Sequence, residues 1–292
     1  MTIKQLVLLL FISALWGGSF IFMKILTPVF GPVMTSSFRL LIASGFLYVY
    51  FLVTKHKIIW RQSLKFFVIV GILNSAIPFV MYSFASSYID ASLSVILNST
   101  SPMFGAVFGF IILKEKLNLS KSIGLIIGSF GVFIVSSFTI FNGSINTYLA
   151  IAACIIAAML YGYSGNYVKK NVQHLDSKTL TFGSLLFGGL SLLPFSFFHG
   201  IEGTIDYKII LLFIFFGVMS TAVTYIIYYK LIKEIGAMKA LTVTYLMPIF
   251  GVLWAYLFLN EIPSVNIYIG SVVILFGVFL VTTSKLKQKS GI

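Results

Sequence analysis

Charge is scarce in this sequence. Only 9% of its 292 residues are Asp, Glu, Lys or Arg, whereas 59% are hydrophobic. A soluble domain carries roughly 25% charged residues, because its surface must face water. The chain therefore has too little charge to cover a water-soluble globule, which indicates an integral membrane protein. Cysteine is nearly absent as well: Cys154 is the single cysteine, which excludes an internal disulfide framework.

Catalytic groupings are also missing from the apolar part of the sequence. The seven acidic residues lie at the ends of apolar runs or in loops, and His56, His174 and His199 fall in loops away from acids inside the runs. We therefore predict that the chain is not an enzyme and that it holds no metal and no cofactor. The G-x-x-x-x-G-K-[ST] loop of nucleotide-driven pumps is absent too, which excludes that class.

Long apolar runs make up most of the chain. A membrane-spanning helix needs about 20 mostly apolar residues, and charged, Gly, Pro or Asn residues divide the sequence into runs of that length. Because the runs are continuously apolar, they favour helices over barrel strands, which would alternate. We predict an all-α integral membrane protein with ten spans, at about 5–26, 32–53, 64–86, 91–113, 119–138, 147–168, 179–198, 208–229, 236–259 and 264–283.

The basic residues lie almost entirely on one side of this predicted topology. With the N-terminus in the cytoplasm, 17 of the 20 Lys and Arg residues fall on the cytoplasmic side. This distribution follows the positive-inside rule. We therefore expect a multi-pass protein of the cytoplasmic (inner) membrane with both termini in the cytoplasm. The net charge of +13 then reflects topology, and we expect no nucleic-acid partner.

Part of the sequence occurs twice, 146 residues apart. The segment "PMFGAVFGFIILKE" at 102–115 returns as "PIFGVLWAYLFLNE" at 248–261, and "FGVFIV" at 130–135 returns as "FGVFLV" at 276–281. Further upstream, Gly71 matches Gly217 and Tyr82 matches Tyr228 at the same offset. A duplicated five-helix unit explains this spacing.

The repeat divides the chain into two halves of five spans each. Because five is an odd number, the second half must cross the membrane upside down relative to the first. Inverted repeats of this kind recur in secondary transporters, where substrate sites lie near the middle of the membrane. The predicted units are a first repeat at 1–140, a second repeat at 146–284 and a basic cytoplasmic tail at 285–292.

These motifs resemble the drug/metabolite transporter (DMT) superfamily, and specifically its EamA-type members with ten helices in two repeats. The similarity covers nearly the whole chain, and it also rests on "ALWGGSFIFMK" at 14–24 and "FRLL" at 38–41. The resemblance implies transport of amino acids, other metabolites or drugs, often by export. It also implies a central cavity surrounded by the first four helices of each half, with the fifth and tenth helices at the periphery.

Polar and aromatic residues inside apolar helices are candidates for lining that cavity, because polar groups are costly where they face lipid. Each also has a structural explanation, since Ser, Thr and Asn hold transmembrane helices together and Trp or Tyr marks the membrane interface. The candidates for substrate binding are Trp16, Ser19, Arg39, Asn74, Tyr82, Asn98, Tyr161, Tyr163, Ser164, Asn166, Thr221, Tyr225, Thr244 and Tyr245.

Arg39 and Lys24 are cations within predicted spans. An arginine at the centre of a span costs about 2.5–3.5 kcal/mol on insertion scales. Arg39 either pairs with a carboxylate or phosphate of the substrate, or bonds loop carbonyls or lipid headgroups. The resemblance favours the structural role, because an arginine is common at this place across many substrates. For Lys24, both kinds of role are open.

Two prolines and two glutamates of the repeat are candidates for structural roles. Pro102 and Pro248 each remove a helix hydrogen bond, so we predict kinks that act as hinges beside the cavity. Glu115 and Glu261 end the fourth and ninth helices. We expect each glutamate to accept hydrogen bonds from the start of the next helix, where a carboxylate is favoured.

Together, these features predict a secondary transporter that moves a small organic solute across the membrane by alternating access, as an exporter or an exchanger. A lipid flippase and an integral-membrane enzyme are the alternatives. Membrane lipid and the solute are the expected partners. Glycine pairs such as Gly105 and Gly109 favour close helix packing within one chain, so a monomer is expected and a dimer is left open.

Overall fold

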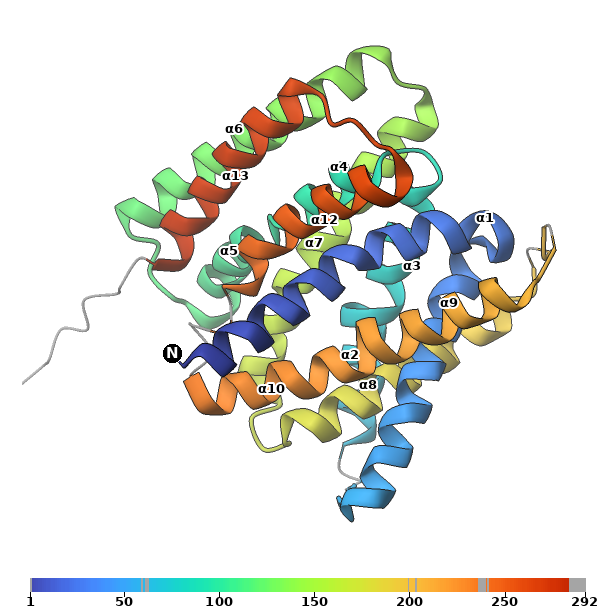
Figure 1. Cartoon of the computed structure of the whole chain (residues 1–292). Helices are drawn as coiled ribbons and strands as arrows, with labels where there is room; N and C mark the ends of the chain where they lie inside the picture. Colours follow the sequence, from blue (N-terminus) through green and yellow to red (C-terminus); the bar gives the residue numbers. More distant parts are fainter. Residues whose placement is uncertain are drawn as a thin grey trace, which may run out of the picture.

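The apolar stretches of the chain form helices, because a backbone in lipid must satisfy its own hydrogen bonds. The computed structural model describes residues 2–58, 60, 63–198, 200–202, 204–235, 240 and 242–283, and in this part of the chain every regular element is helical. Figure 1 shows these helices as one bundle. The predicted all-α class is confirmed for the described residues, and the predicted tail at 285–292 lies outside them.

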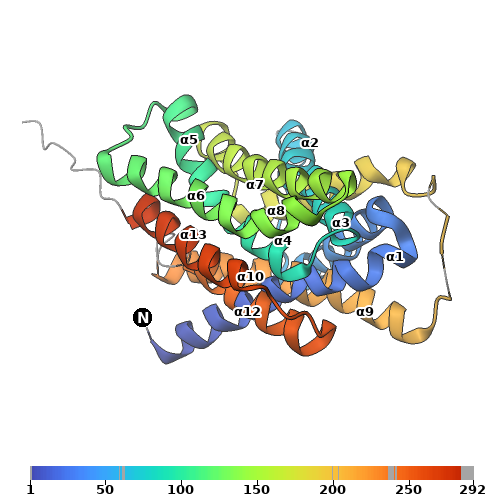
Figure 2. The same cartoon turned by 90° about the horizontal axis from the view of Figure 1, so that it is seen from above.

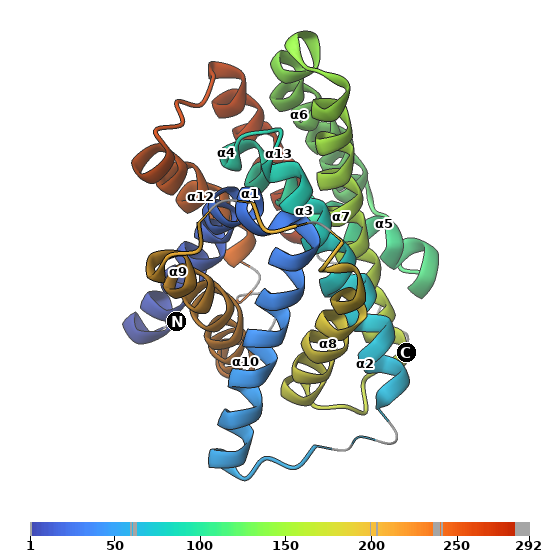
Figure 3. The same ribbon diagram turned by 90° about the vertical axis from the view of Figure 1, so that its right-hand side faces the viewer.

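Two predicted spans appear as one element, α1 (Ile3–Thr54), which breaks at Gly31. Gly31 has φ 71° and ψ 163°, a conformation that residues with a side chain disfavour. Pro28 and Pro32 flank it and interrupt the helical hydrogen bonds. The chain changes direction at this point, as Figure 3 shows, so α1 supplies two arms to the bundle.

The remaining elements follow the predicted runs closely. The first half continues with α2 (Leu64–Gly71), the π-helical turn η1 (Ile72–Ala76), α3 (Ile77–Ser86), α4 (Ala91–Asn98), α5 (Ser101–Leu113) and α6 (Leu119–Asn142). The second half contains α7 (Ile145–Asn171), α8 (Ser177–Leu192), the 3-10 turn η2 (Leu193–Phe195), α9 (Tyr207–Gly217), the π-helical turn η3 (Val218–Val223), α10 (Thr224–Ile235), α12 (Val243–Leu259) and α13 (Val265–Thr283).

Several of these helices are suited to a membrane. Among the described residues, seven helical segments are long and apolar enough to cross one, with α1 counted once and the shorter α12 left aside. Large apolar side chains face outward: Ile126 is 71% exposed and Val272 is 68% exposed. Contiguous apolar surface of this kind is uncommon on soluble monomers, so it is explained by contact with lipid. The chain is a multi-pass membrane protein.

Helices α6 and α13 lie side by side at the edge of the bundle, as both Figure 1 and Figure 2 show. Glycines set their distance. A Cβ atom on Gly124 would lie 2.6 Å from the carbonyl oxygen of Gly277, and one on Gly270 would lie 2.9 Å from that of Gly131. In the sequence repeat, Gly270 is the counterpart of Gly124, and Gly277 is the counterpart of Gly131. The contact between Gly124 and Gly277 is therefore repeated by their counterparts, Gly270 and Gly131.

The structure corrects the prediction for Pro102. The chain leaves the helix after Asn98, and Pro102 lies in the first turn of α5. Proline is favoured there, because the backbone N–H that it lacks would have no partner within the helix. Pro102 therefore starts a new helix instead of kinking a continuous one, whereas Pro248 lies inside α12.

The predicted partners of Glu115 and Glu261 are also wrong. Glu261 does not cap the helix that follows it; its carboxylate accepts hydrogen bonds from the backbone N–H groups of Ala91 (2.9 Å) and Ser92 (3.1 Å) at the start of α4. Glu115 forms an ion pair with Lys169 at 2.7 Å. The hydrogen bond from Lys169 holds the pKa of Glu115 below its ordinary value. These partners belong to the other half of the chain, although Glu115 also pairs with Lys121 at 3.7 Å, near the start of α6.

Candidate functional site

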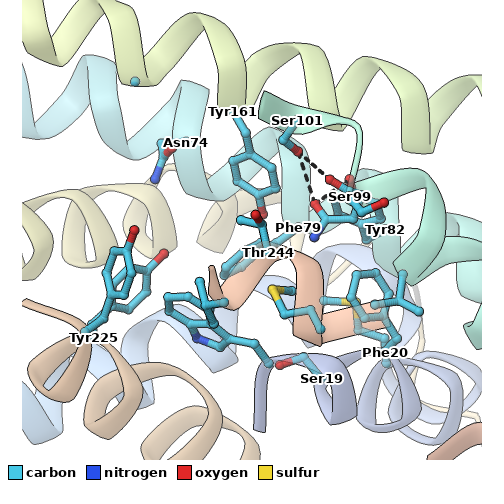
Figure 4. Close-up of a pocket in the computed structure, with 18 of the residues that line it drawn as sticks. Ser19, Phe20, Asn74, Phe79, Tyr82, Ser99, Ser101, Tyr161, Tyr225 and Thr244 are labelled. Atoms are coloured by element: carbon cyan, nitrogen blue, oxygen red, sulfur yellow. Dashed lines mark hydrogen bonds between the residues drawn. The ribbon is translucent and has the colours of Figure 1, made fainter. Parts of the chain in front are cut away.

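The helices enclose a central cavity of about 400 Å³. Small-molecule sites in proteins typically measure about 300–1,000 Å³, so the space suits a small organic solute. Its walls come from both arms of α1, from η1, α3, α4 and α5, and from α7, α10 and α12. Figure 4 shows the side chains that converge on it, with Tyr161 of α7 extending toward Thr244 of α12.

The structure brings many of the predicted site residues together on this cavity. They come from helices far apart in the sequence, and both halves contribute. The predicted residues that line the cavity are Trp16, Ser19, Arg39, Asn74, Tyr82, Asn98, Tyr161, Tyr225 and Thr244.

Three predicted residues pack between helices instead. The ring of Tyr163 contacts Phe108 edge-on at a centroid distance of 5.4 Å. Asn166 donates hydrogen bonds to the carbonyl oxygens of Gly105 and Gly162, both at 2.8 Å. Tyr245 bonds to the hydroxyl of Thr282 and to the carbonyl oxygen of Val278 on α13. These side chains join helices, as expected for polar groups in transmembrane packing.

Helical phase explains why such neighbours differ. Successive residues of a helix are rotated by about 100°, so residues four apart share a face. Tyr161 and Gly165 therefore both line the cavity, whereas Tyr163 between them points away from it. Ser164 lines a second cavity of about 180 Å³ that shares Gly165 with the first. Thr221 lies behind the wall, where it bonds Arg39.

Several cavity residues were missed in the sequence. Tyr228 was detectable, because it is the repeat counterpart of Tyr82, and the same offset relates Phe79 to Tyr225. Met23 carried no signal, since an apolar side chain in an apolar helix is expected in the core.

Hydrogen bonds and ring contacts fix the aromatic part of the wall. The indole Nε1 of Trp16 donates to the hydroxyl of Thr224 at 2.9 Å. The Trp16 ring lies 5.7 Å from the Tyr225 ring and 5.1 Å from the Tyr228 ring, measured between centroids. On the opposite side, the Tyr82 hydroxyl donates to the Asn98 side-chain oxygen at 2.9 Å. The site is therefore largely formed before any solute arrives.

Arg39 is a buried cation in the cavity wall, with 4% of its surface exposed. Its Nε donates to the Thr221 hydroxyl at 2.8 Å, and its Nη2 reaches the Ser19 hydroxyl at 3.5 Å. The guanidinium carbon lies 4.0 Å from the ring centre of Phe79 and 4.2 Å from that of Phe216. Arg39 is thus held inside the bundle, away from lipid headgroups.

Lys24 has a structural partner. Its ammonium group donates a hydrogen bond to the carbonyl oxygen of Ile89 at 2.9 Å, at the turn between α3 and α4. Lys24 is not among the residues that line the cavity. Of the two open roles, the structure therefore supports the structural one.

Comparison with known proteins identifies the family. The model of the EamA-like transporter family matches residues 4–137 and, a second time, residues 148–283. A solved crystal structure that covers 96% of this chain and 97% of its own superposes with a TM-score of 0.67 at 11% sequence identity, which shows a shared fold.

Relatives with similar sequences are named as transporters. The uncharacterized transporter YoaV of Bacillus subtilis is 24% identical over 98% of this chain and 99% of its own length. An uncharacterized transporter of Archaeoglobus fulgidus is 26% identical over 99% of this chain and 100% of its own, and one of Clostridium kluyveri is 30% identical over 77% of this chain and 74% of its own. Since the family model covers nearly all of the sequence, the chain belongs to the EamA-like transporter family.

Proposed function

We propose that this chain is a secondary transporter that carries a small organic solute across the cytoplasmic membrane by alternating access, as an exporter or an exchanger. The observation that carries the proposal is the central cavity, which is walled by equivalent residues of the two halves. At the 146-residue offset, Asn98 corresponds to Thr244, and both residues line the cavity. A solute there would contact both halves at once, as a site in the middle of an inverted repeat requires.

Recurring local geometry supports the proposal of two inverted five-helix repeats, at 1–140 and 146–284. The π-helical turns η1 and η3 begin at Ile72 and Val218, which are 146 residues apart. Lys114 and Asn260 end their helices in the same left-handed conformation, with φ of 56° and 54°. The exchanged glycine contacts between α6 and α13 are a further sign of two-fold symmetry. Two such repeats would give ten spans with both termini on one side, which the positive-inside rule assigns to the cytoplasm.

One end of the bundle is closed by a contact of Glu261. Glu261 binds the start of α4, where the cap residue Asp90 makes no side-chain capping bond of its own. Burial, together with the nearby Glu261 carboxylate, raises the pKa of Asp90. The counterpart Glu115 pairs with Lys169 and Lys121, and the counterparts of Ala91 and Ser92, at 237 and 238, lie outside the described residues. Alternating access requires that one gate is shut while the other is open.

The cavity continues toward the opposite end. The second cavity reaches Val168 near the end of α7 and Leu180 near the start of α8. Lys169 and Lys178 lie beside these residues in the sequence, on the side that the positive-inside rule assigns to the cytoplasm. The arrangement therefore supports a conformation that faces the cytoplasm and is closed toward the outside.

Replacing Gly165 by tryptophan tests whether the cavity is the transport path. A Cβ atom at Gly165 meets nothing within 4 Å, so an indole can enter the cavity without disturbing backbone contacts. We expect transport to fall to background while the protein still folds. Substrates are first found by thermal stabilisation of the purified protein against amino acids, nucleotides, amines, organic acids and lipids, and their uptake is then followed in proteoliposomes.

Gly45→Trp is the matched control, because Gly45 lies in α1, also has open space around its Cβ position and faces outward. It is expected to transport like the wild type. Full transport by Gly165→Trp would overturn the proposed path. Movement of a labelled phospholipid that Gly165→Trp blocks would support a flippase instead.

The proposed hinge at Pro102 gives a second test. Pro102→Ala restores an N–H group at the start of α5 and favours a continuous helix from α4 to α5. We expect the transport rate to fall by roughly tenfold, with little change in the amount of folded protein measured by size-exclusion chromatography. Equal losses of transport and of folded protein would remove the hinge.

A further inference from the structure

Arg39 lacks the counter-charge that a buried guanidinium normally requires. All seven acidic residues of the chain belong to the part that the structure describes, and none of them forms an ion pair with Arg39 there. Burying a charge without a partner is costly, because the low-dielectric interior does not replace its hydration. Part of this cost is offset by Phe79 and Phe216, whose ring faces attract a cation.

The hydrogen bonds of Arg39 are incomplete as well. A guanidinium carries five N–H donors. Nε is bonded to Thr221, and the contact of Nη2 with Ser19 is at the limit of a hydrogen bond at 3.5 Å. Nη1 is buried and has no partner in the described structure. The N–H groups point outward in the plane of the guanidinium, so a further acceptor must approach within that plane, past the Phe79 and Phe216 rings that lie over it.

Arg39 lies in the cavity wall. Ser19 and Phe79, which contact the guanidinium, both line the cavity together with Arg39. Among the described residues of this wall, Arg39 alone is charged. The rest of the wall is amphipathic, with the Trp16, Tyr225 and Tyr228 rings on one side and amides and hydroxyls on the other. One fixed positive charge beside flat apolar surface is complementary to one negative charge on a flat or apolar body.

We propose that Arg39 anchors the carboxylate of a small monoanionic organic acid whose apolar body lies against these rings. The inference rests on the proposed function and specifies its substrate class. A carboxylate approaching in the guanidinium plane accepts two parallel hydrogen bonds, and it replaces the weak contact with Ser19. A phosphate dianion fits less well, because the wall offers no second cation.

Binding of matched probes tests the anchor without any mutation. Phenylacetate, phenylacetamide and phenethylamine share one ring and differ in carrying a negative, neutral or positive group; hexanoate and hexanamide provide an aliphatic pair. We expect the acids to raise the melting temperature of the purified protein in lipid nanodiscs at concentrations at least tenfold below those needed for the amides or the amine. No acid binding at millimolar concentration, or equal binding of acid and amide in both pairs, would show the anchor proposal to be wrong.

Variants then assign the preference to Arg39. Arg39→Gln is expected to weaken acid binding by roughly 100-fold and amide binding little, so that the preference disappears. Lys24→Gln, which removes a cation away from the cavity, is expected to keep the preference. If Arg39→Gln does not fold, Arg39→Lys keeps the charge but loses the two-point bond, and an intermediate preference is expected. A full preference for acids in either folded Arg39 variant would contradict the assignment.

Transport assays separate this inference from the proposed function. If acids bind in a way that depends on Arg39 but no solute moves in proteoliposomes, the proposed transport function is wrong and the proposed role of Arg39 stands. If the protein transports neutral or cationic solutes without preferring acids, and Gly165→Trp blocks this transport, the proposed role of Arg39 is wrong and the proposed transport function stands.

Discussion

Gly162→Leu is expected to prevent stable folding. Gly162 of α7 lies against α5 with no space for a side chain: a Cβ atom would lie 2.5 Å from the backbone nitrogen of Gly105 and 2.7 Å from the backbone carbon of Phe104. Backbone atoms cannot rotate away as a side chain can, so the two helices would have to separate. Overpacking typically costs about 1–3 kcal/mol and occasionally more, and we expect this site to reach or exceed 3 kcal/mol.

The measurement is the melting temperature and folded yield of the purified variant, with Gly165→Leu as the control. Both glycines lie on α7, three residues apart, and the substitution is the same. Gly165 has open space at its Cβ position, and leucine has a higher helix propensity than glycine, so this control is expected to be as stable as the wild type. Equal stability of the two variants would mean that the contact between α5 and α7 is looser than described.

Glu261→Ala is expected to open the end of the bundle that the proposed topology places outside. Its carboxylate accepts hydrogen bonds from the backbone of Ala91 and Ser92 and from the Ser92 hydroxyl at 2.9 Å. These bonds join the end of α12 to the start of α4, across the two halves. Hydrogen bonds to a charged group contribute about 1.5–3 kcal/mol each, so losing the carboxylate is expected to shift the balance between closed and open by at least 100-fold.

Thiol labelling measures this shift. In a Cys154→Ser background, Ser101→Cys places one thiol on the cavity wall, and an impermeant maleimide added outside reports whether the outer end is open. The thiol is expected to react slowly in the protein that retains Glu261 and quickly in the one that carries Glu261→Ala. Asp206→Ala is the control, because Asp206 caps its own helix through the backbone N–H of Ile209. It is expected to cost about 1 kcal/mol of stability without changing the labelling rate; unchanged labelling in Glu261→Ala would contradict the closure.

Much of the fold was predictable from local sequence, because lipid forces each apolar run of about 20 residues to be helical. The repeat also showed where unusual backbone recurs: Gly71 and Gly217, matched in the sequence, immediately precede the two π-helical turns. The break at Gly31 was also predictable, because it falls between two predicted spans, where Pro28 and Pro32 interrupt the helix.

The kinds of residue in the candidate site were predictable from the sequence, but which of the polar residues face the cavity was less so. Polarity selected Tyr161 and Tyr163 alike, but only the direction of each side chain decides which one reaches the cavity, and direction depends on how the helix is rotated in the bundle. Partners distant in the sequence were equally hidden. Glu261 binds Ala91, 170 residues away, whereas local helix rules pointed it to the segment that follows.

The glycine contacts between α6 and α13 bear on how the two halves can diverge. A mutation alters one copy at a time, and a side chain at Gly124 would meet the backbone of Gly277 whatever happens at Gly270. Each copy of the scaffold is therefore under separate selection to stay as it is. At the cavity wall the two copies keep Tyr82 and Tyr228 but differ at other positions, as with Asn98 and Thr244. New cargo can thus evolve by changing one half of the lining while the inherited framework stays fixed.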